Sequence, residues 1–283
     1  MNTLCIFGVI DTMKHLRTIF NFYINSSIHV ALAICSLCTV TFLKEDFELS
    51  VYFLGFVFFA SISGYNFVKY ASIAKLHHKS LTDSLRTIQI FSLLSLGALL
   101  YFSLYMRLSF LYAAIILGIL TLFYAIPIFP KESNLRTISG LKIYIIALVW
   151  ALVAGLLPNF YVGEPITTDT VVLIMQYALF VLAITLPFEI RDLNYDVPQL
   201  ATIPQRIGVK NTKILGLLLL FLMVVLEVWK NDSSIENVMI SVGIVLAASL
   251  ALLCSSKAQS KHYSSFWVES LPIFWAILAY LFI

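Results

Sequence analysis

The sequence predicts an all-α integral membrane protein with about nine transmembrane helices. Of its 283 residues, 60% are apolar and only 12% are charged, whereas soluble domains are about 45 to 50% apolar and about 25% charged. A spanning helix needs about 20 mostly apolar residues, so nine spans use about 180 residues and leave little chain for a soluble domain. The composition therefore excludes nucleic-acid readers, dinucleotide-binding enzymes and secreted disulfide scaffolds.

Apolar windows divide the chain into an N-terminal extension, residues 1–15, and a single polytopic membrane domain, residues 16–283. Each window ends where charged residues, prolines or clusters of small polar residues interrupt the apolar run. In chain order the expected spans are residues 18–43, 50–70, 87–105, 108–126, 143–161, 170–188, 213–229, 236–255 and 266–283. The segments between them carry most of the charge.

The cations are distributed unequally between the two sides of the predicted bundle. Fifteen of the eighteen Lys and Arg residues fall on one side, and the exceptions are Lys44, Arg107 and Lys230. Under the positive-inside rule, the amino terminus faces the cytoplasm and nine spans place Ile283 outside. We therefore expect a multi-pass protein of the plasma (inner) membrane, with its active loops on the cytoplasmic side.

An acidic segment follows the sixth span. Glu189, Asp192 and Asp196 have the spacing i, i+3, i+7, which places them on one face of a helix, and Arg191 points nearly opposite. Like charges at such spacing destabilise a helix, so they need a reason to be together. A hard divalent cation bound through carboxylate oxygen atoms is the usual reason, and a solvated acidic loop end is the alternative.

The segment Glu189-Ile-Arg-Asp192-x-x-x-Asp196, with Thr202 and Gly208 after it, resembles the second aspartate-rich motif of the UbiA superfamily of intramembrane prenyltransferases, D-x-x-D-x-x-x-D. Nine helices and a cytoplasmic amino terminus also match that family. The resemblance implies a UbiA-like bundle that binds an isoprenyl diphosphate through Mg²⁺, ionises it and transfers the prenyl group to a small-molecule or lipid acceptor. It implies Glu189, Asp192 and Asp196 as metal ligands.

The family's first motif, N-D-x-x-D-x-x-x-D, aligns at the end of the second span, where the chain departs from it. Asn66 is retained, but Phe67, Tyr70 and Ala74 stand where the family has Asp. Cations crowd the same region, Lys69 among them, and ammonium or guanidinium groups could hold a diphosphate directly in place of a bridging metal. Ordinary positive-inside charges are the alternative explanation for these cations.

The resemblance also implies contacts for the diphosphate. Lys131 matches a diphosphate-binding lysine in the family's segment after the fourth span, and Asn66 and Arg206 are the other expected contacts. Polar groups inside apolar spans normally face the bundle interior. On that ground Asn25, Tyr124 and Glu269 are candidate acceptor or cavity groups, although hydrogen bonding or ion pairing between helices would also explain them.

Three functions follow from these features. The leading hypothesis is a transferase of the UbiA type, working in the lipid bilayer with an isoprenyl diphosphate and without nucleic acid. The second is a catalytically diverged UbiA-like protein that binds a lipid diphosphate or acts as a partner subunit, because the first motif lacks its carboxylates. A secondary transporter is the third, since interrupted helices and intramembrane charges occur there too.

Overall fold

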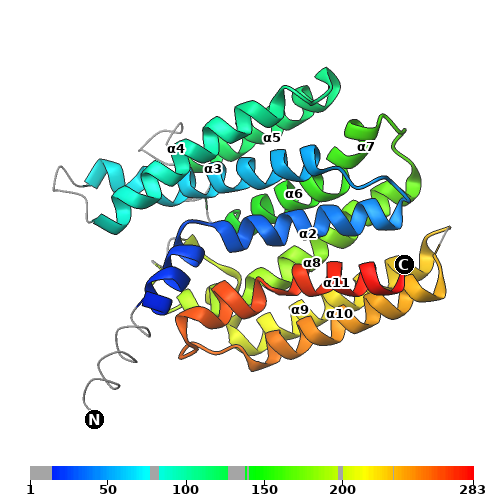
Figure 1. Cartoon of the computed structure of the whole chain (residues 1–283). Helices are drawn as coiled ribbons and strands as arrows, with labels where there is room; N and C mark the ends of the chain where they lie inside the picture. Colours follow the sequence, from blue (N-terminus) through cyan, green and yellow to red (C-terminus); the bar gives the residue numbers. More distant parts are fainter. Residues whose placement is uncertain (1–14, 77–82, 127–137, 139, 197–199, 232) are drawn as a thin grey trace, which may run out of the picture.

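The protein is an all-helical bundle in the computed structural model, which describes residues 15–76, 83–126, 138, 140–196, 200–231 and 233–283. After a first helix, His15–Asn25, the elements are α2 (Ile28–Lys44), α3 (Val51–Leu76), α4 (Asp83–Ser103), α5 (Leu108–Ala125), α6 (Lys142–Gly155), α7 (Leu157–Val162), α8 (Thr168–Asp192), α9 (Ile203–Trp229), α10 (Ile235–Cys254), the π-helix η3 (Tyr263–Val268) and α11 (Leu271–Phe282). Figure 1 shows the long helices running roughly side by side between two ends of the bundle.

The number of spans agrees with the sequence. In the described ranges eight helical segments are long and apolar enough to cross a membrane, and a ninth span results if the helix His15–Asn25 and α2 are counted together. The prediction of an integral multi-pass membrane protein with about nine spans is thus confirmed. Which end faces the cytoplasm stays a prediction.

The first span is bent, whereas the sequence led us to expect a continuous helix over residues 18–43. The helix His15–Asn25 and α2 meet at 54°. Ser27 lies between them in the left-handed region with φ 65°, a conformation that costs energy for any residue other than glycine. Side chains of α3 form hydrogen bonds with Asn25, Ser26 and Ser27 at this break.

Two later spans also differ in detail from the expected ranges. α9 begins at Ile203, ten residues before the expected start, and Gly208 interrupts it with φ 77° and ψ 162°, values that favour glycine. Gln205 accepts a hydrogen bond from the Thr202 backbone N–H at 2.9 Å, which caps the helix start. The last span opens with the π-helix η3 before α11 continues.

The core lies where α2, α6, α8 and α11 meet. α8 packs against α6 and α9, and α2 packs against α3 and α11. Side chains at the centre include Tyr177, Phe180 and Trp275, all fully buried. By contrast α4 and α5 lie along one side of the bundle (Figure 1) and expose large apolar side chains such as Leu93 and Ile116. Such outward apolar surface suits contact with lipid.

Three cations fall outside the basic side predicted from the sequence, and they lie at one end of the bundle, near α7. They are Lys44, Arg107 and Lys230. Lys44 Nζ lies 2.7 Å from Glu227 Oε2 and Lys230 Nζ lies 3.8 Å from Glu45. Arg107 donates to the Val162 carbonyl at 2.6 Å. Their common location agrees with the expected division of charge between the two sides.

The Lys44–Glu227 pair is fully buried and ties several helices together. Both side chains have 0% exposure, and Glu227 also accepts from Gln176 at 2.8 Å and from Ser241 at 3.1 Å. The network therefore joins α2, α8, α9 and α10. A buried charge whose partner is removed is strongly destabilising.

We predict that Lys44→Ala lowers the free energy of unfolding by about 3 to 5 kcal/mol, because it leaves the Glu227 carboxylate buried without its counter-ion. The double variant Lys44→Met, Glu227→Met should recover part of this loss, since it removes both charges. Unfolding in detergent, followed by circular dichroism, measures the change. Lys257→Ala, at an exposed position, is the control and should stay within about 0.5 kcal/mol. A single variant as stable as this control would contradict the prediction.

Candidate functional site

The three carboxylates of the predicted second motif lie at the end of α8. Glu189 and Asp192 belong to its last turn, after Pro187 within the helix. The chain then makes one more turn, in which the Asp196 backbone N–H donates to the Asp192 carbonyl at 2.8 Å. The spacing seen in the sequence thus keeps the three carboxylates on successive turns at one end of the bundle.

Glu189 is turned inward. It is 2% exposed, and its Oε2 accepts a hydrogen bond from the backbone N–H of Ile203 at 3.2 Å. That N–H opens α9, and the first N–H groups of a helix lack partners within it. Lys142, Asp192 and Asp196 are the charged groups that act on Glu189 electrostatically. Glu189 therefore joins α8 to the start of α9.

Asp192 is paired with its neighbour in the chain. Arg191 Nε donates to Asp192 Oδ1 at 2.7 Å, and Arg191 Nη2 donates to Oδ2 at 3.1 Å. The guanidinium also lies over the Phe188 ring, 5.3 Å from its centroid. The expectation that Arg191 points away from the carboxylates is therefore wrong for Asp192, because the long arginine side chain folds back along the helix.

Asp196 and Arg206 line the same pocket. It has a volume of about 420 Å³, and its lining residues are Leu193, Asp196, Ala201, Gln205 and Arg206. Gln205 donates to the Asp196 carbonyl at 3.2 Å, and Arg206 Nε donates to the Ala201 carbonyl at 2.9 Å. One predicted metal ligand and one predicted diphosphate contact are thus brought together at the junction of α8 and α9.

In this arrangement two of the three carboxylates have partners within the protein. Glu189 and Asp192 already bond Ile203 and Arg191, and within the described ranges no three His, Cys, Asp or Glu side chains are grouped so that they could hold a metal. The role of the three carboxylates as metal ligands stays a prediction.

The remnant of the first motif holds the bend in the first span. Asn66 is 2% exposed, and its Oδ1 accepts from Ser27 Oγ at 2.8 Å. Its Nδ2 donates to the Ser26 carbonyl at 3.0 Å and to Ser92 Oγ at 2.8 Å. The amide expected to contact a diphosphate thus makes three hydrogen bonds within the protein, and its contact with a diphosphate stays a prediction.

Two further residues of this region bond the same bend. Lys69 Nζ and the Tyr70 hydroxyl each donate to the backbone carbonyl of Asn25, both at 3.0 Å. Asn25 thus takes part through its backbone, whereas the sequence pointed to its side chain. Phe67 is 40% exposed, and the side chain of Ala74 lies outside those that the structure describes.

Glu269 directly follows the π-helix η3 and is half-buried. Lys69 of α3 and Arg191 of α8 lie near enough to influence its carboxyl group, which in turn influences Tyr23 and Tyr65. The structure therefore places Glu269, a candidate from the sequence, at the end of the bundle to which both motif helices contribute.

Tyr124, the other predicted residue on a spanning helix, is 6% exposed. On α3, the Tyr65 hydroxyl accepts from Trp150 Nε1 at 2.5 Å. Sequence reasoning missed Tyr23 and Tyr65. Their hydroxyl groups within apolar spans were the available signal, since buried tyrosine hydroxyls usually find a partner. Lys131 lies outside the described residues.

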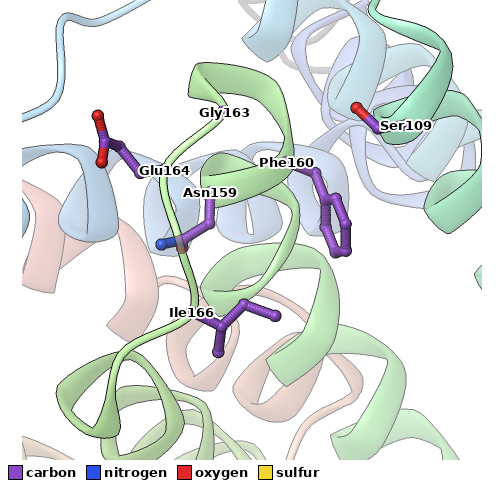
Figure 2. A pocket seen from close by; sticks show the side chains of 6 residues that line it. All are labelled: Ser109, Asn159, Phe160, Gly163, Glu164 and Ile166. Atoms are coloured by element: carbon purple, nitrogen blue, oxygen red, sulfur yellow. The ribbon is translucent and has the colours of Figure 1, made fainter.

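A second pocket lies at the opposite end of the bundle. It measures about 220 Å³ and is lined by Ser109, Asn159, Phe160, Gly163, Glu164 and Ile166, as Figure 2 shows. None of the residues expected to bind metal, diphosphate or acceptor lines it. The candidate site is therefore the end formed by α3, α8, the start of α9 and η3.

Comparison with known proteins finds one informative likeness. A solved structure of a digeranylgeranylglyceryl phosphate synthase in membranes, a UbiA-superfamily prenyltransferase, superposes with a TM-score of 0.57 over 94% of this chain and 97% of that chain, at 17% sequence identity. No family model matches the sequence, and no curated protein matches it. The chain therefore has a UbiA-like membrane fold.

We predict that Asn66→Ala lowers the free energy of unfolding by about 2 kcal/mol, because it removes three hydrogen bonds and leaves the Ser27 hydroxyl buried without its acceptor. Thermal or denaturant unfolding in detergent measures the loss. Asn211→Ala, which removes one bond at an exposed position of α9, should change stability by less than about 0.5 kcal/mol. An Asn66 variant as stable as wild type would show that the bend does not depend on this side chain.

Proposed function

We propose that the protein is a membrane prenyltransferase that moves an isoprenyl group from a prenyl diphosphate to a small-molecule or lipid acceptor. The observation that carries the proposal is the E-x-x-D-x-x-x-D segment at the end of α8, beside the pocket shared by Asp196 and Arg206. The UbiA-like fold supports it. The proposed location is the plasma (inner) membrane, with the site on the cytoplasmic side.

The chemistry requires charge stabilisation at the leaving diphosphate. The bond between the prenyl carbon and the diphosphate oxygen breaks, and negative charge accumulates on that oxygen in the transition state. Arg206 and Lys131 are the proposed cationic contacts, with Asn66 as a polar one. Glu189, Asp192 and Asp196 are the proposed ligands of Mg²⁺, which when bound neutralises diphosphate charge.

The acceptor is proposed to enter from the bundle interior. Tyr124 and Glu269 are the candidate contacts, because both are polar groups within apolar spans that are at least partly buried. Asn25 is a third candidate and stands at the bend of the first span, where its carbonyl accepts from Lys69 and Tyr70. The apolar helix faces around these groups suit a prenyl chain.

A second candidate function is lipid-diphosphate binding without catalysis, as a diverged relative or a partner subunit. It is favoured by the first motif, whose Asn66, Lys69 and Tyr70 bond the bend of the first span. Residues used in this way stabilise the fold whether or not a reaction takes place.

We predict that the purified protein in detergent, given a series of isoprenyl diphosphates, candidate acceptors and Mg²⁺, releases pyrophosphate. Changing Asp192 or Asp196 to Ala should lower the rate by about 100-fold or more, the usual effect of losing a group that stabilises developing charge. Pyrophosphate release is measured with a coupled assay, with and without EDTA. Glu164→Ala, a carboxylate change at the opposite end of the bundle, should leave the rate unchanged.

The outcomes separate the two candidates. Turnover that survives the double change of Asp192 and Asp196 would rule out the role given to the acidic segment. Thermal stabilisation by a prenyl diphosphate without any pyrophosphate release would support the non-catalytic binder. Neither stabilisation nor turnover with any donor would count against both.

A further inference from the structure

A small pocket at the α7 end of the bundle contains a buried acceptor that lacks a donor. Asn159 of α7 lines this pocket of about 220 Å³ (Figure 2). The residue is 2% exposed, and among the described residues nothing donates a hydrogen bond to its Oδ1. A buried polar atom without a partner is unfavourable. The pocket therefore favours a ligand that brings an N–H or O–H donor to Asn159.

The orientation of the Asn159 amide follows from its neighbours. Its Nδ2 donates to the Pro165 carbonyl at 3.4 Å and to Thr170 Oγ1 at 3.5 Å. A carbonyl oxygen accepts hydrogen bonds and donates none, so the amide nitrogen lies on the Pro165 side. Exchanging the two ends of the amide would set two oxygens against each other. The atom left without a partner is therefore the oxygen, an acceptor.

Charged groups of both signs lie at this pocket. Glu164, an exposed carboxylate, lines it together with Asn159. Arg107 lies against Gly163, another lining residue, so closely that a Cβ at Gly163 would collide with Arg107 Nη1. That nitrogen donates to the Val162 carbonyl at 2.6 Å, which uses one of the five N–H donors of a guanidinium. The pocket thus offers acceptors for a cation, with a guanidinium beside it for an anion.

The pocket also adjoins a helix face that suits contact with lipid. Ser109, in the first turn of the spanning helix α5, lines the pocket. Leu108 and Tyr112, on the same part of α5, are largely exposed, and exposed apolar side chains of a spanning helix contact acyl chains. The first turn of a span lies at the level of the lipid headgroups. A phospholipid packed along α5 therefore brings its headgroup to this pocket.

We propose that this pocket binds the headgroup of a phospholipid that carries a primary ammonium, as phosphatidylethanolamine does. The ammonium donates to Asn159 Oδ1 and pairs with Glu164, and Arg107 contacts the phosphate. At about 220 Å³, the pocket is smaller than the roughly 300 to 1,000 Å³ of sites for drug-sized ligands, which suits so small a group. The inference does not depend on the proposed function, because the acidic segment lies at the other end of α8.

The test compares lipids that share their acyl chains and differ in the headgroup. Dioleoyl phosphatidylethanolamine, phosphatidylcholine and phosphatidylglycerol are each titrated against the whole chain in detergent, and bound lipid is measured by native mass spectrometry. Choline keeps the charge and the phosphate of the ethanolamine headgroup but has no N–H donor. We expect phosphatidylethanolamine to bind about tenfold more tightly than the other two, the effect of one charge-assisted hydrogen bond. Free phosphoethanolamine should bind more weakly than the lipid, because it lacks apolar contact with α5.

Single variants separate the contacts to the ammonium from the contact to the phosphate. Asn159→Leu removes the acceptor at similar volume and should bring the affinity for phosphatidylethanolamine close to that for phosphatidylcholine. Glu164→Ala, at an exposed position, should reduce the same preference, and it serves as the test if the Asn159 variant fails to fold. Arg107→Gln should weaken both lipids equally, since both carry the phosphate. Glu236→Ala removes an exposed carboxylate from the first turn of α10, outside the pocket, and should bind all three lipids like wild type.

Three results would overturn the inference. One is equal wild-type affinity for phosphatidylethanolamine and phosphatidylcholine, which would show that no N–H donor is recognised. Another is an unchanged preference between these two lipids in both Asn159→Leu and Glu164→Ala. The third is free phosphoethanolamine that binds as tightly as the lipid, which would make the ligand a soluble one. Pyrophosphate release is assayed in detergent without these lipids and does not depend on this pocket, so any of these results leaves the proposed function intact.

Discussion

The tie between Asn66 and the break at Ser26 and Ser27 is the interaction on which the candidate site depends. A chain in a bilayer has no water to satisfy backbone groups that a broken helix leaves open, so the protein must supply their partners. Asn66 bonds the Ser26 carbonyl, while Lys69 and Tyr70 bond that of Asn25. One helix, α3, thereby allows the first span to bend and places an ammonium beside the bend.

Charged side chains are arranged differently at the two ends of the bundle. At the α7 end, Lys44 and Glu227 are fully enclosed and Gln176 and Ser241 complete their bonding, so that the network serves packing. At the other end, Arg191 and Asp192 pair at partly exposed positions, and Asp196 and Arg206 line a pocket of about 420 Å³. An enclosed pair is complete without a ligand, whereas charged groups that line a pocket are suited to binding one.

Much of the fold could be predicted from apolar runs, because a lipid environment allows few alternatives to spanning helices. The bend at Ser27 could not, since serine is not a strong helix breaker and the partner of the Ser27 hydroxyl, Asn66, is 39 residues away in the chain. The early start of α9 did have a local signal in Thr202, Pro204 and Gln205, which is a helix-start pattern. The spacing of Glu189, Asp192 and Asp196 predicted their shared location, but the bonds of Glu189 to Ile203 and of Arg191 to Asp192 arise from contacts that spacing does not specify.

The departures from the first motif are physically consistent with one another. With aromatic residues at Phe67 and Tyr70, α3 has no carboxylates there to repel one another, and so it needs no metal to neutralise them. The Tyr70 hydroxyl and Lys69 instead donate to a carbonyl, which carboxylates are unable to do. Replacing Tyr70 by Asp would therefore remove one hydrogen-bond donor to the Asn25 carbonyl. It would also place a negative charge beside that carbonyl. The bend and a carboxylate-bound metal compete for the same positions on α3, and the sequence of this chain favours the bend.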